Sequence, residues 1–340
     1  MRWALLLAAA LVAFPWLVND FWVLQVGGRS LAFGTVALSL IFLASRGGML
    51  SLAQLAVAGV AGYTLAYFSA PMAGAGVALG FAVAVPLALV MATAFGLLVG
   101  VVAVRTEGIY TLMITLAIAM GVYYLALQNY ALFNGFTGFT RVPAPMLAGI
   151  DLARPVPFFY LSLACAAGCY GLLRWITDTP FGLALQASRD NARRLQALGY
   201  RVAHIRIAAF ALAGFVAGVG GILNTWLNGS MSPGSIALGP SINVLMAAVL
   251  GGLGAPEGAY LGALLFVLVQ SFAIYVVRPE RFNTVIGLVF IAVVVFSPDG
   301  VLGLRGALRS GIGRLRRYGA GRLPKLPLDI KTTLGNDHAG

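Results

Sequence analysis

Ionisable side chains that could carry acid–base or metal chemistry are few in this sequence, and they avoid the interiors of its apolar runs. A proton- or sodium-driven carrier usually keeps an acid at membrane depth, and a catalytic or metal site needs several such groups together. The sequence therefore predicts neither an ion-coupled carrier nor an enzyme, and no metal site. The 10 acids and 2 histidines are Asp20, Glu107, Asp151, Asp178, Asp190, Glu257, Glu280, Asp299, Asp329, Asp337, His204 and His338.

Nucleotide chemistry also lacks its usual parts. No G-x-x-x-x-G-K-[ST] motif occurs, and the only lysines are Lys325 and Lys331. We therefore expect no cofactor on this chain, and any ATP and Mg²⁺ would bind partner subunits. Cys165 and Cys169 lie four residues apart on one predicted helix face, where neither a disulfide nor a metal site is expected.

The composition places the chain in a bilayer. Hydrophobic residues make up 60% of the sequence, charged residues 9%, and the mean hydropathy is +0.93, which no soluble globule of this size can accommodate. A net charge of +12 invites a nucleic-acid partner, but the arginines are not interleaved with aromatics on one face. They follow membrane topology instead, so we expect lipid and not nucleic acid around the chain.

Apolar runs between charges and Gly or Pro breaks predict an all-α, polytopic membrane protein with about ten transmembrane helices. Several runs are short and the fourth contains Pro86, so we expect some short or broken helices. The first run lacks a convincing cleavage site and is interpreted as a retained span. The predicted spans are 3–18, 30–45, 50–69, 76–103, 109–128, 157–175, 207–227, 241–253, 259–277 and 283–297.

Charge asymmetry orients these spans. Ten spans with both termini cytoplasmic leave all but five of the 22 Lys and Arg residues on the inner side. The basic tail 305–340 is expected at the inner headgroups and then partly disordered. The longest outer loop, 129–156, could dock an external partner or form a lid over helix ends. The five outer arginines are Arg29, Arg141, Arg154, Arg278 and Arg281.

The loop 178–206 is longer than a simple turn requires. Thr179 and Pro180 predict a helix start, Asp190 could cap a second short helix, and Gly199 could end it with a left-handed C-cap. A mostly apolar stripe recurs at steps of three and four, which predicts an amphipathic element that touches a partner. The alternative is a basic loop that only obeys the orientation rule. The stripe is Ala184, Ala187, Asn191, Leu195, Leu198, Val202 and Ile205, with Arg189, Arg193, Arg201 and Arg206 pointing elsewhere.

Small and polar residues within the predicted spans could line a path for solute through the membrane. GGLGAP at 251–256 interrupts an apolar run, so its backbone must be buried in protein or line a wet cavity. GGMLSLAQLAVAG near residue 47 is a faint echo of this segment that does not establish a duplication. Each polar residue alone more often makes a contact between helices than a contact with solute. The candidates are Tyr123, Tyr124, Asn224, Asn243, Gly251, Gly252 and Gly254.

Five sequence blocks follow one another in the chain: GGMLSLAQLAVAGVAGYT, RTEGIYTLMITLA, the segment from TPFGLALQASRDNARRLQALGYRVAHIR into the next span, VLMAAVLGGLGAPEGAYLGALL and FSPDGVLGL. Together and in this order, they resemble the branched-chain amino acid ABC transporter permease family. The resemblance covers about residues 45–305. The sequence departs from the family pattern at Ala192, Arg193 and Arg194, at Ala53 and Gln54 where Gly-His is usual, and at Glu257 where an aromatic is common.

This resemblance implies a permease domain at 1–304 in a bacterial inner (plasma) membrane. It also implies a second homologous permease, two cytoplasmic ATP-binding subunits and a periplasmic or extracellular solute-binding protein, which together import branched-chain or related amino acids. Gln54 joins the candidate path through its place in the first block. A passive channel for urea or a short-chain amide is the alternative. The implied ATPase-docking residues are Ala187, Ser188, Arg189, Asp190, Asn191, Leu195, Leu198 and Gly199.

Overall fold

The computed structural model describes residues 13–69, 80–147 and 150–276, with the isolated positions 11, 284, 287, 288, 291 and 300. This part of the chain is helical apart from two pairs of short antiparallel strands, which confirms the all-α class. Most of the predicted tenth span, the basic tail and most of the first span lie outside the described residues. The elements are η1 (Trp22–Gly28, a π-helix), α2 (Arg29–Gly47), α3 (Gln54–Ser69), α4 (Phe81–Ala103), α5 (Ile109–Gln128), α6 (Tyr130–Phe133), β1 (Phe139–Thr140), β2 (Met146–Leu147), β3 (Ile150–Asp151), α7 (Pro155–Thr177), α8 (Pro180–Ala197), α9 (Val202–Asn228), β4 (Ser230–Met231), η2 (Pro233–Ile236, a 3-10 helix), α10 (Leu238–Gly251) and α11 (Gly258–Val276).

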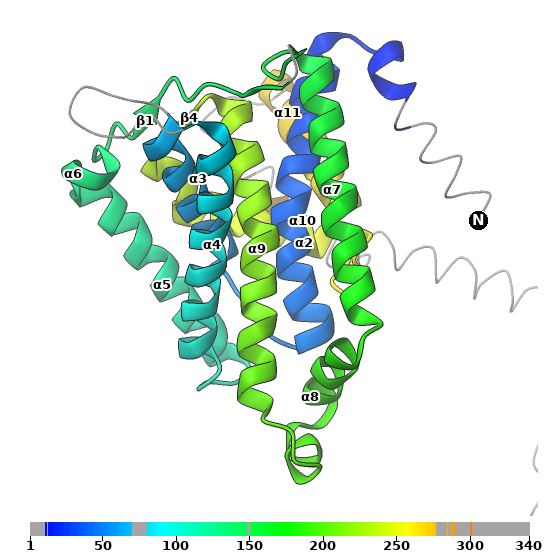
Figure 1. Cartoon of the computed structure of the whole chain (residues 1–340). Helices are drawn as coiled ribbons and strands as arrows, with labels where there is room; N and C mark the ends of the chain where they lie inside the picture. Colours follow the sequence, from blue (N-terminus) through cyan, green and yellow to red (C-terminus); the bar gives the residue numbers. More distant parts are fainter. Residues whose placement is uncertain are drawn as a thin grey trace, which may run out of the picture.

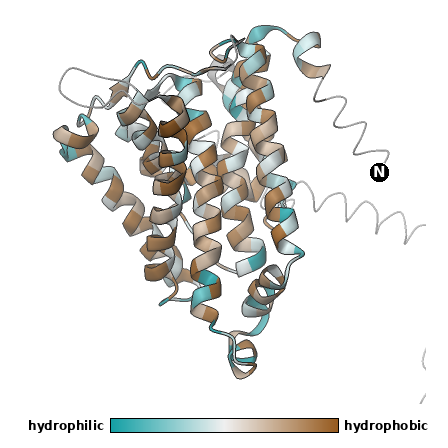
Figure 2. Cartoon of the chain, viewed as in Figure 1, coloured by the Kyte–Doolittle hydropathy of each residue, from teal (hydrophilic) through white to brown (hydrophobic). Residues whose placement is uncertain are grey.

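The long helices form one bundle with α9 at its centre (Figure 1). α9 packs most extensively against α4, α2 and α3. Within the described ranges, five helices are long and apolar enough to cross a membrane, with η1 and α2 together forming one helix of 26 residues. Hydrophobic residues predominate along these helices, whereas hydrophilic ones gather at both ends of the bundle, near α8 and at the opposite end (Figure 2). The chain is therefore a multi-pass membrane protein, while the total of ten spans and the position of the termini stay predictions.

Glycines allow α9 to occupy the centre. A side chain at Gly221 would overlap the carbonyl oxygen of Ala58 on α3, and a Cβ at Gly214 would lie 2.9 Å from the Ala92 carbonyl oxygen and 3.0 Å from the Gly96 Cα on α4. Small residues at such positions let membrane helices approach closely and gain dispersion contacts. The glycine cluster of this span therefore serves helix packing.

Two helical hairpins belong to the bundle; the first packs against α9 and the second against α2. In the first, α2 ends at Gly47 and α3 begins at Gln54; in the second, α10 ends at Gly251 and α11 begins at Gly258. Each connecting stretch starts with a glycine at positive φ, Gly48 at 65° and Gly252 at 106°. Such angles are strained for other residues. This explains why the two similar segments, which start at Gly47 and at Gly251, both begin with a pair of glycines.

The ends of the bundle differ in structure. β1 pairs with β4, and β2 with β3, at the end opposite α8 (Figure 1). Phe139 of β1 is fully buried and its ring lies 6.4 Å from that of Tyr63 on α3. The β1 part of the loop 129–156 thus packs over α3, as expected of a lid, and docking of an external partner stays a prediction. We call the α8 end the inner end and the strand end the outer end, following the predicted orientation.

Helix boundaries follow the predicted spans closely in some places and not in others. α5 coincides with the predicted span 109–128, whereas α3 begins at Gln54 and not at residue 50. The prediction that Arg29 lies outside the second span is wrong, because the helix begins at Trp22 and Arg29 lies within it. The long inner loop ends earlier than predicted, since α9 already begins at Val202.

Candidate functional site

α8 is two short helices joined at a kink. Thr179 is the N-cap and Pro180 the first residue, as the sequence predicted, although the Thr179 hydroxyl donates to the carbonyl oxygen of Ile176 at 2.6 Å. Asn191 has non-helical angles, φ −159° and ψ 95°. Its Oδ1 accepts from the backbone N–H of Arg194 at 3.0 Å. The predicted second helix exists, but Asn191 caps it and not Asp190.

The second helix ends as the sequence predicted. Gly199 has φ +86°. Its N–H donates to the carbonyl oxygen of Gln196 at 2.9 Å, and the N–H of Tyr200 donates to that of Leu195 at 3.3 Å. This pair of bonds is a Schellman motif, which satisfies carbonyl groups at a helix end and favours glycine at the left-handed position.

The predicted apolar stripe of α8 is correct only in part. Leu185 and Ser188 are buried, together with Leu195 at 5% exposure, whereas Leu198 is 74% exposed. The kink at Asn191 breaks the helical register, so residues before and after it do not share one face. Of the two leucines expected to meet an ATPase, only Leu198 is free to do so, because Leu195 packs within this chain.

Arginines attach the first half of α8 to the end of α2. Nη1 of Arg46 donates to Oε1 of Gln186 at 3.1 Å, and Nη1 of Arg189 donates to the carbonyl oxygen of Ser45. The Arg189 side chain also covers Gly48, where an added Cβ would lie 2.8 Å from its Cγ. These contacts join α8 to the stretch between α2 and α3.

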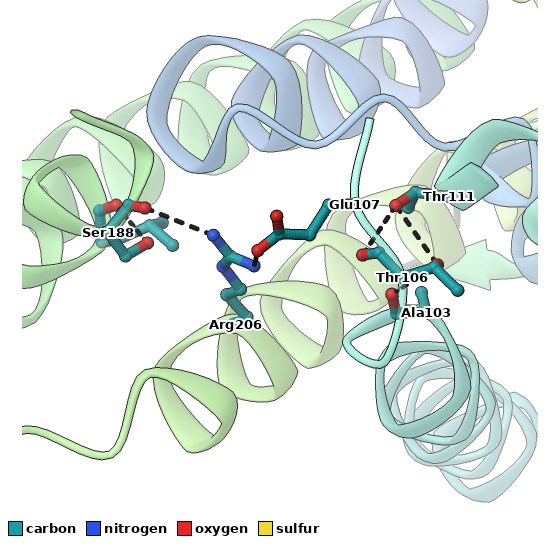
Figure 3. Close-up of polar contacts among 7 residues, drawn as sticks. Ala103, Thr106, Glu107, Thr111, Ser188 and Arg206 are labelled. Carbon is teal, nitrogen blue, oxygen red and sulfur yellow. Dashed lines mark hydrogen bonds and ion pairs between the residues drawn. The ribbon is translucent and has the colours of Figure 1, made fainter. Parts of the chain in front are cut away.

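Arg206 connects α8 with two further parts of the inner end (Figure 3). Its Nη2 donates to the carbonyl oxygen of Ser188 at 3.3 Å, and its Nη1 lies 3.5 Å from Oε1 of Glu107 in the α4–α5 connection. Ser188 is in the last turn before the kink, where carbonyl groups lack regular helical partners. The Arg206 side chain is 12% exposed and that of Glu107 80%. The prediction that Arg206 points away from the packed face is therefore wrong.

An open cavity of about 630 Å³ lies where these contacts meet. We call it the inner cavity. Both hairpin connections contribute to its wall, Met49 and Leu50 from the first and Leu253 and Gly254 from the second. The broken GGLGAP segment thus lines a cavity at Gly254, while Gly251 and Gly252 are buried in protein, as the sequence predicted. The charged groups of the wall are Glu107, Arg189, Asp190 and Arg206.

A second cavity of about 200 Å³ lies between α2, α3, α9, α10 and α11, near β4 and η2. We call it the outer cavity. Asn224 and Asn243, two candidate path residues, line it. The amide Nδ2 of Asn228 donates to Oδ1 of Asn224 at 3.1 Å, and this hydrogen bond fixes the two side-chain amides of α9 relative to each other. Arg29 also lines this cavity, although the sequence placed it outside the membrane.

A buried polar contact joins α2 and α3 at a residue that lies, in the sequence, between residues of the two cavities. Leu50 lines the inner cavity and Leu55 the outer one. Between them, Gln54 is 1% exposed, and the Ser39 hydroxyl shares its hydrogen between Oε1 of Gln54 at 3.1 Å and the carbonyl oxygen of Val36 at 2.6 Å. We call this contact the partition. Gln54 is thus a buried contact between helices.

The remaining candidates lie elsewhere. Tyr123 and Tyr124 are on α5, with ring centroids 5.2 Å apart, and neither lines the inner or the outer cavity. Arg206 and Glu107 were missed as a pair because they lie far apart in sequence. The one sequence signal for Arg206 was its place four residues after the start of α9, on the side of the helix that packs against the bundle.

Comparison with known proteins identifies the family. A model of the family described as "Branched-chain amino acid transport system / permease component" matches residues 23–294. The chain belongs to this family. It is 27% identical over 251 residues to the high-affinity branched-chain amino acid transport system permease protein LivM of Escherichia coli K12, an alignment that covers 66% of this chain and 58% of LivM. No solved structure matches.

Other relatives of this permease are named for other solutes. The autoinducer 2 import system permease LsrC of Salmonella choleraesuis is 32% identical over 202 residues, covering 57% of this chain and 54% of LsrC. The ribose import permease RbsC of Haemophilus influenzae is 24% identical over 228 residues, covering 65% of this chain and 69% of RbsC. The permease thus spans a little over half the length of LivM and LsrC. These relatives are membrane transport subunits and not enzymes.

Proposed function

We propose that this permease is the membrane-spanning subunit of an ATP-driven importer for branched-chain or related amino acids. A second homologous permease, two cytoplasmic ATP-binding subunits that hold ATP and Mg²⁺, and an external solute-binding protein complete the complex. The solute class is supported by the family description, and the LsrC and RbsC likenesses make autoinducer 2 and sugars the competing classes.

The attachment of α8 is the observation that carries the coupling role. An ATPase that binds the exposed surface of α8 would displace an element held to α2 by Arg46 and Arg189, and to α9 and the α4–α5 connection by Arg206. Packed helices and hydrogen bonds transmit such a displacement when they have two stable arrangements. The permease then needs no catalytic residue, because it converts movement at α8 into rearrangement of the two hairpins.

Among the residues proposed for docking, the exposed ones contact the ATPase and the buried ones hold α8 in place. Asp190, Asn191, Leu198 and Gly199 belong to the first kind, and Ala187 is half-buried beside them. Ser188 and Leu195 belong to the second kind, and Arg189 does both.

Co-purification tests this proposal. We expect an ATPase with a P-loop and a second permease to accompany the tagged chain in mild detergent. Leu198→Asp should release the ATPase because it places a charge in an apolar contact. Leu132→Asp is the matched control, since Leu132 of α6 is also exposed but lies at the outer end. A chain that purifies alone and shows passive solute flux in liposomes would instead support the channel alternative.

A further inference from the structure

Arg29 lies inside a membrane-length helix. The helix Trp22–Gly47 is continuous, and the seven-residue π-helix η1 precedes Arg29. Arg29 is the eighth of the 26 residues of this helix. A charged side chain within a membrane-spanning helix is costly, and it usually faces a water-filled cavity with a functional role.

The π-helix and its packing direct Arg29 toward the outer cavity. A Cβ at Gly27 would lie 2.7 Å from the Phe159 ring, and one at Gly28 would lie 3.1 Å from that of Phe158, so η1 is fixed against α7. A π turn contains more residues than an α turn, and it therefore changes which residue faces the bundle. Arg29 follows this turn directly and lines the outer cavity with Phe33 and Val36.

No acid compensates Arg29 within the described part of the chain. The wall of the outer cavity contains no Asp or Glu, and Arg29 has no ion pair or hydrogen bond among the described residues. This situation differs from that of Arg206, which contacts Glu107. A half-buried guanidinium without a carboxylate leaves fork-shaped donors that match a carboxylate brought by a ligand.

The rest of the wall suits a small solute with one apolar side. Asn243 and Gln270 have no side-chain hydrogen bond among the described residues, so their amides can bind polar groups of a ligand. Phe33, Val36 and Phe266 form an apolar part. The volume of about 200 Å³ is below the roughly 300–1,000 Å³ of sites for drug-sized ligands, which favours a compact metabolite.

We propose that the outer cavity is a solute-binding site within this single chain and that Arg29 recognises the carboxylate of the solute. This inference rests on the proposed import function and deepens it. A neutral sugar or amide would leave the guanidinium without its partner, so the cavity selects against such solutes. Arg29 therefore supplies specificity in the membrane in addition to any selection by an external binding protein.

Thiol labelling measures the charge of the cavity directly. We would place one cysteine with Ser235→Cys, which lines the outer cavity, in the full complex after replacing the free Cys165 and Cys169 by alanine. An anionic and a cationic methanethiosulfonate reagent then label this thiol at two rates. Arg29→Gln should lower the ratio of the anionic to the cationic rate about tenfold, as expected for loss of one nearby charge, and Arg29→Lys should restore most of it.

Arg154→Gln is the matched control, because Arg154 is an exposed arginine at the outer end where α7 begins. It should leave the ratio unchanged. If Arg29→Gln leaves the ratio as in the parent, or if Arg154→Gln lowers it equally, Arg29 does not set the charge of the cavity and the inference is wrong. That result is independent of whether the complex contains an ATPase or transports any solute.

The same thiol tests the solute class. L-leucine should slow labelling of the parent but not of Arg29→Gln, whereas leucinamide and ribose should have no effect on either. Slower labelling with ribose or leucinamide, or no effect of leucine, would overturn carboxylate recognition. A labelling pattern as expected, in a chain that purifies without an ATPase, would instead contradict only the import function.

Discussion

The inner and outer cavities use their charges in opposite ways. In the inner cavity, Arg206 lies beside Glu107 and donates to Ser188, and Arg189 donates to Ser45, so these arginines hold the protein together. In the outer cavity, Arg29 has no such partner among the described residues. A charge with internal partners stabilises an arrangement of helices, whereas a charge without them is available to a ligand. This contrast supports both of our proposals, a mechanical junction at the inner cavity and a recognition site at the outer one.

The largest expected effect compares the two arginines by stability. Arg206→Ala should lower the free energy of unfolding by about 2–3 kcal/mol, because it removes a charged hydrogen bond from a mostly buried site. Arg29→Ala should not lower it, because no internal bond is lost and a half-buried charge without a partner among the described residues is removed. Chemical unfolding of both purified variants in detergent measures the difference. Equal losses would remove the distinction between the cavities.

An intermediate effect is expected at the partition. Ser39→Ala leaves the buried Oε1 of Gln54 without its partner and should cost about 1–2 kcal/mol in the free energy of unfolding. Ser30→Ala on the same helix is the matched control, because the Ser30 hydroxyl is buried without a hydrogen-bond partner among the described residues. The same unfolding assay should show no loss for Ser30→Ala. A loss in both variants would indicate that packing around the hydroxyl, and not its hydrogen bond to Gln54, stabilises this contact.

The smallest effect concerns the exposed end of the inner ion pair. Glu107→Gln should cost less than about 1 kcal/mol, because Glu107 is largely solvated and such pairs contribute little. The difference from the parent should disappear in about 1 M salt, where exposed charges are screened. Unfolding at low and high salt measures this. A large loss that persists in high salt would show that the carboxylate is a main support of Arg206.

Sequence patterns predicted the elements better than the contacts between them. The span of α5 and the caps at Thr179 and Gly199 follow from local residue preferences, and the structure confirms them. The early start of the Arg29 helix was missed, since GG at 27–28 resembles a break but packs tightly on α7. The break within α8 was predicted one residue early, at Asp190 in place of Asn191, and the apolar stripe was wrongly continued across it because a regular helical period conceals a single non-helical residue.

The sequence identified individual residues of the candidate site, but not the contacts between residues that are far apart in the chain. Asn224 and Asn243 were identified as polar groups within spans, and both line one cavity. Four helices, α5 to α8, lie between Glu107 and Arg206 in the sequence, so no local spacing indicates that the two side chains meet. The exposure of Tyr124 on the outside of α5 likewise depends on which neighbours the fold provides.

Labelling of the inner cavity during ATP hydrolysis tests the mechanical role of this junction most directly. A single cysteine made by Leu253→Cys lies in the wall of that cavity, and its reaction with a neutral thiol reagent can be followed in the assembled complex with and without ATP. We predict that ATP changes the labelling rate severalfold in the parent, and that Arg206→Gln abolishes this change while the ATPase still co-purifies. An unchanged response to ATP in Arg206→Gln would contradict the account.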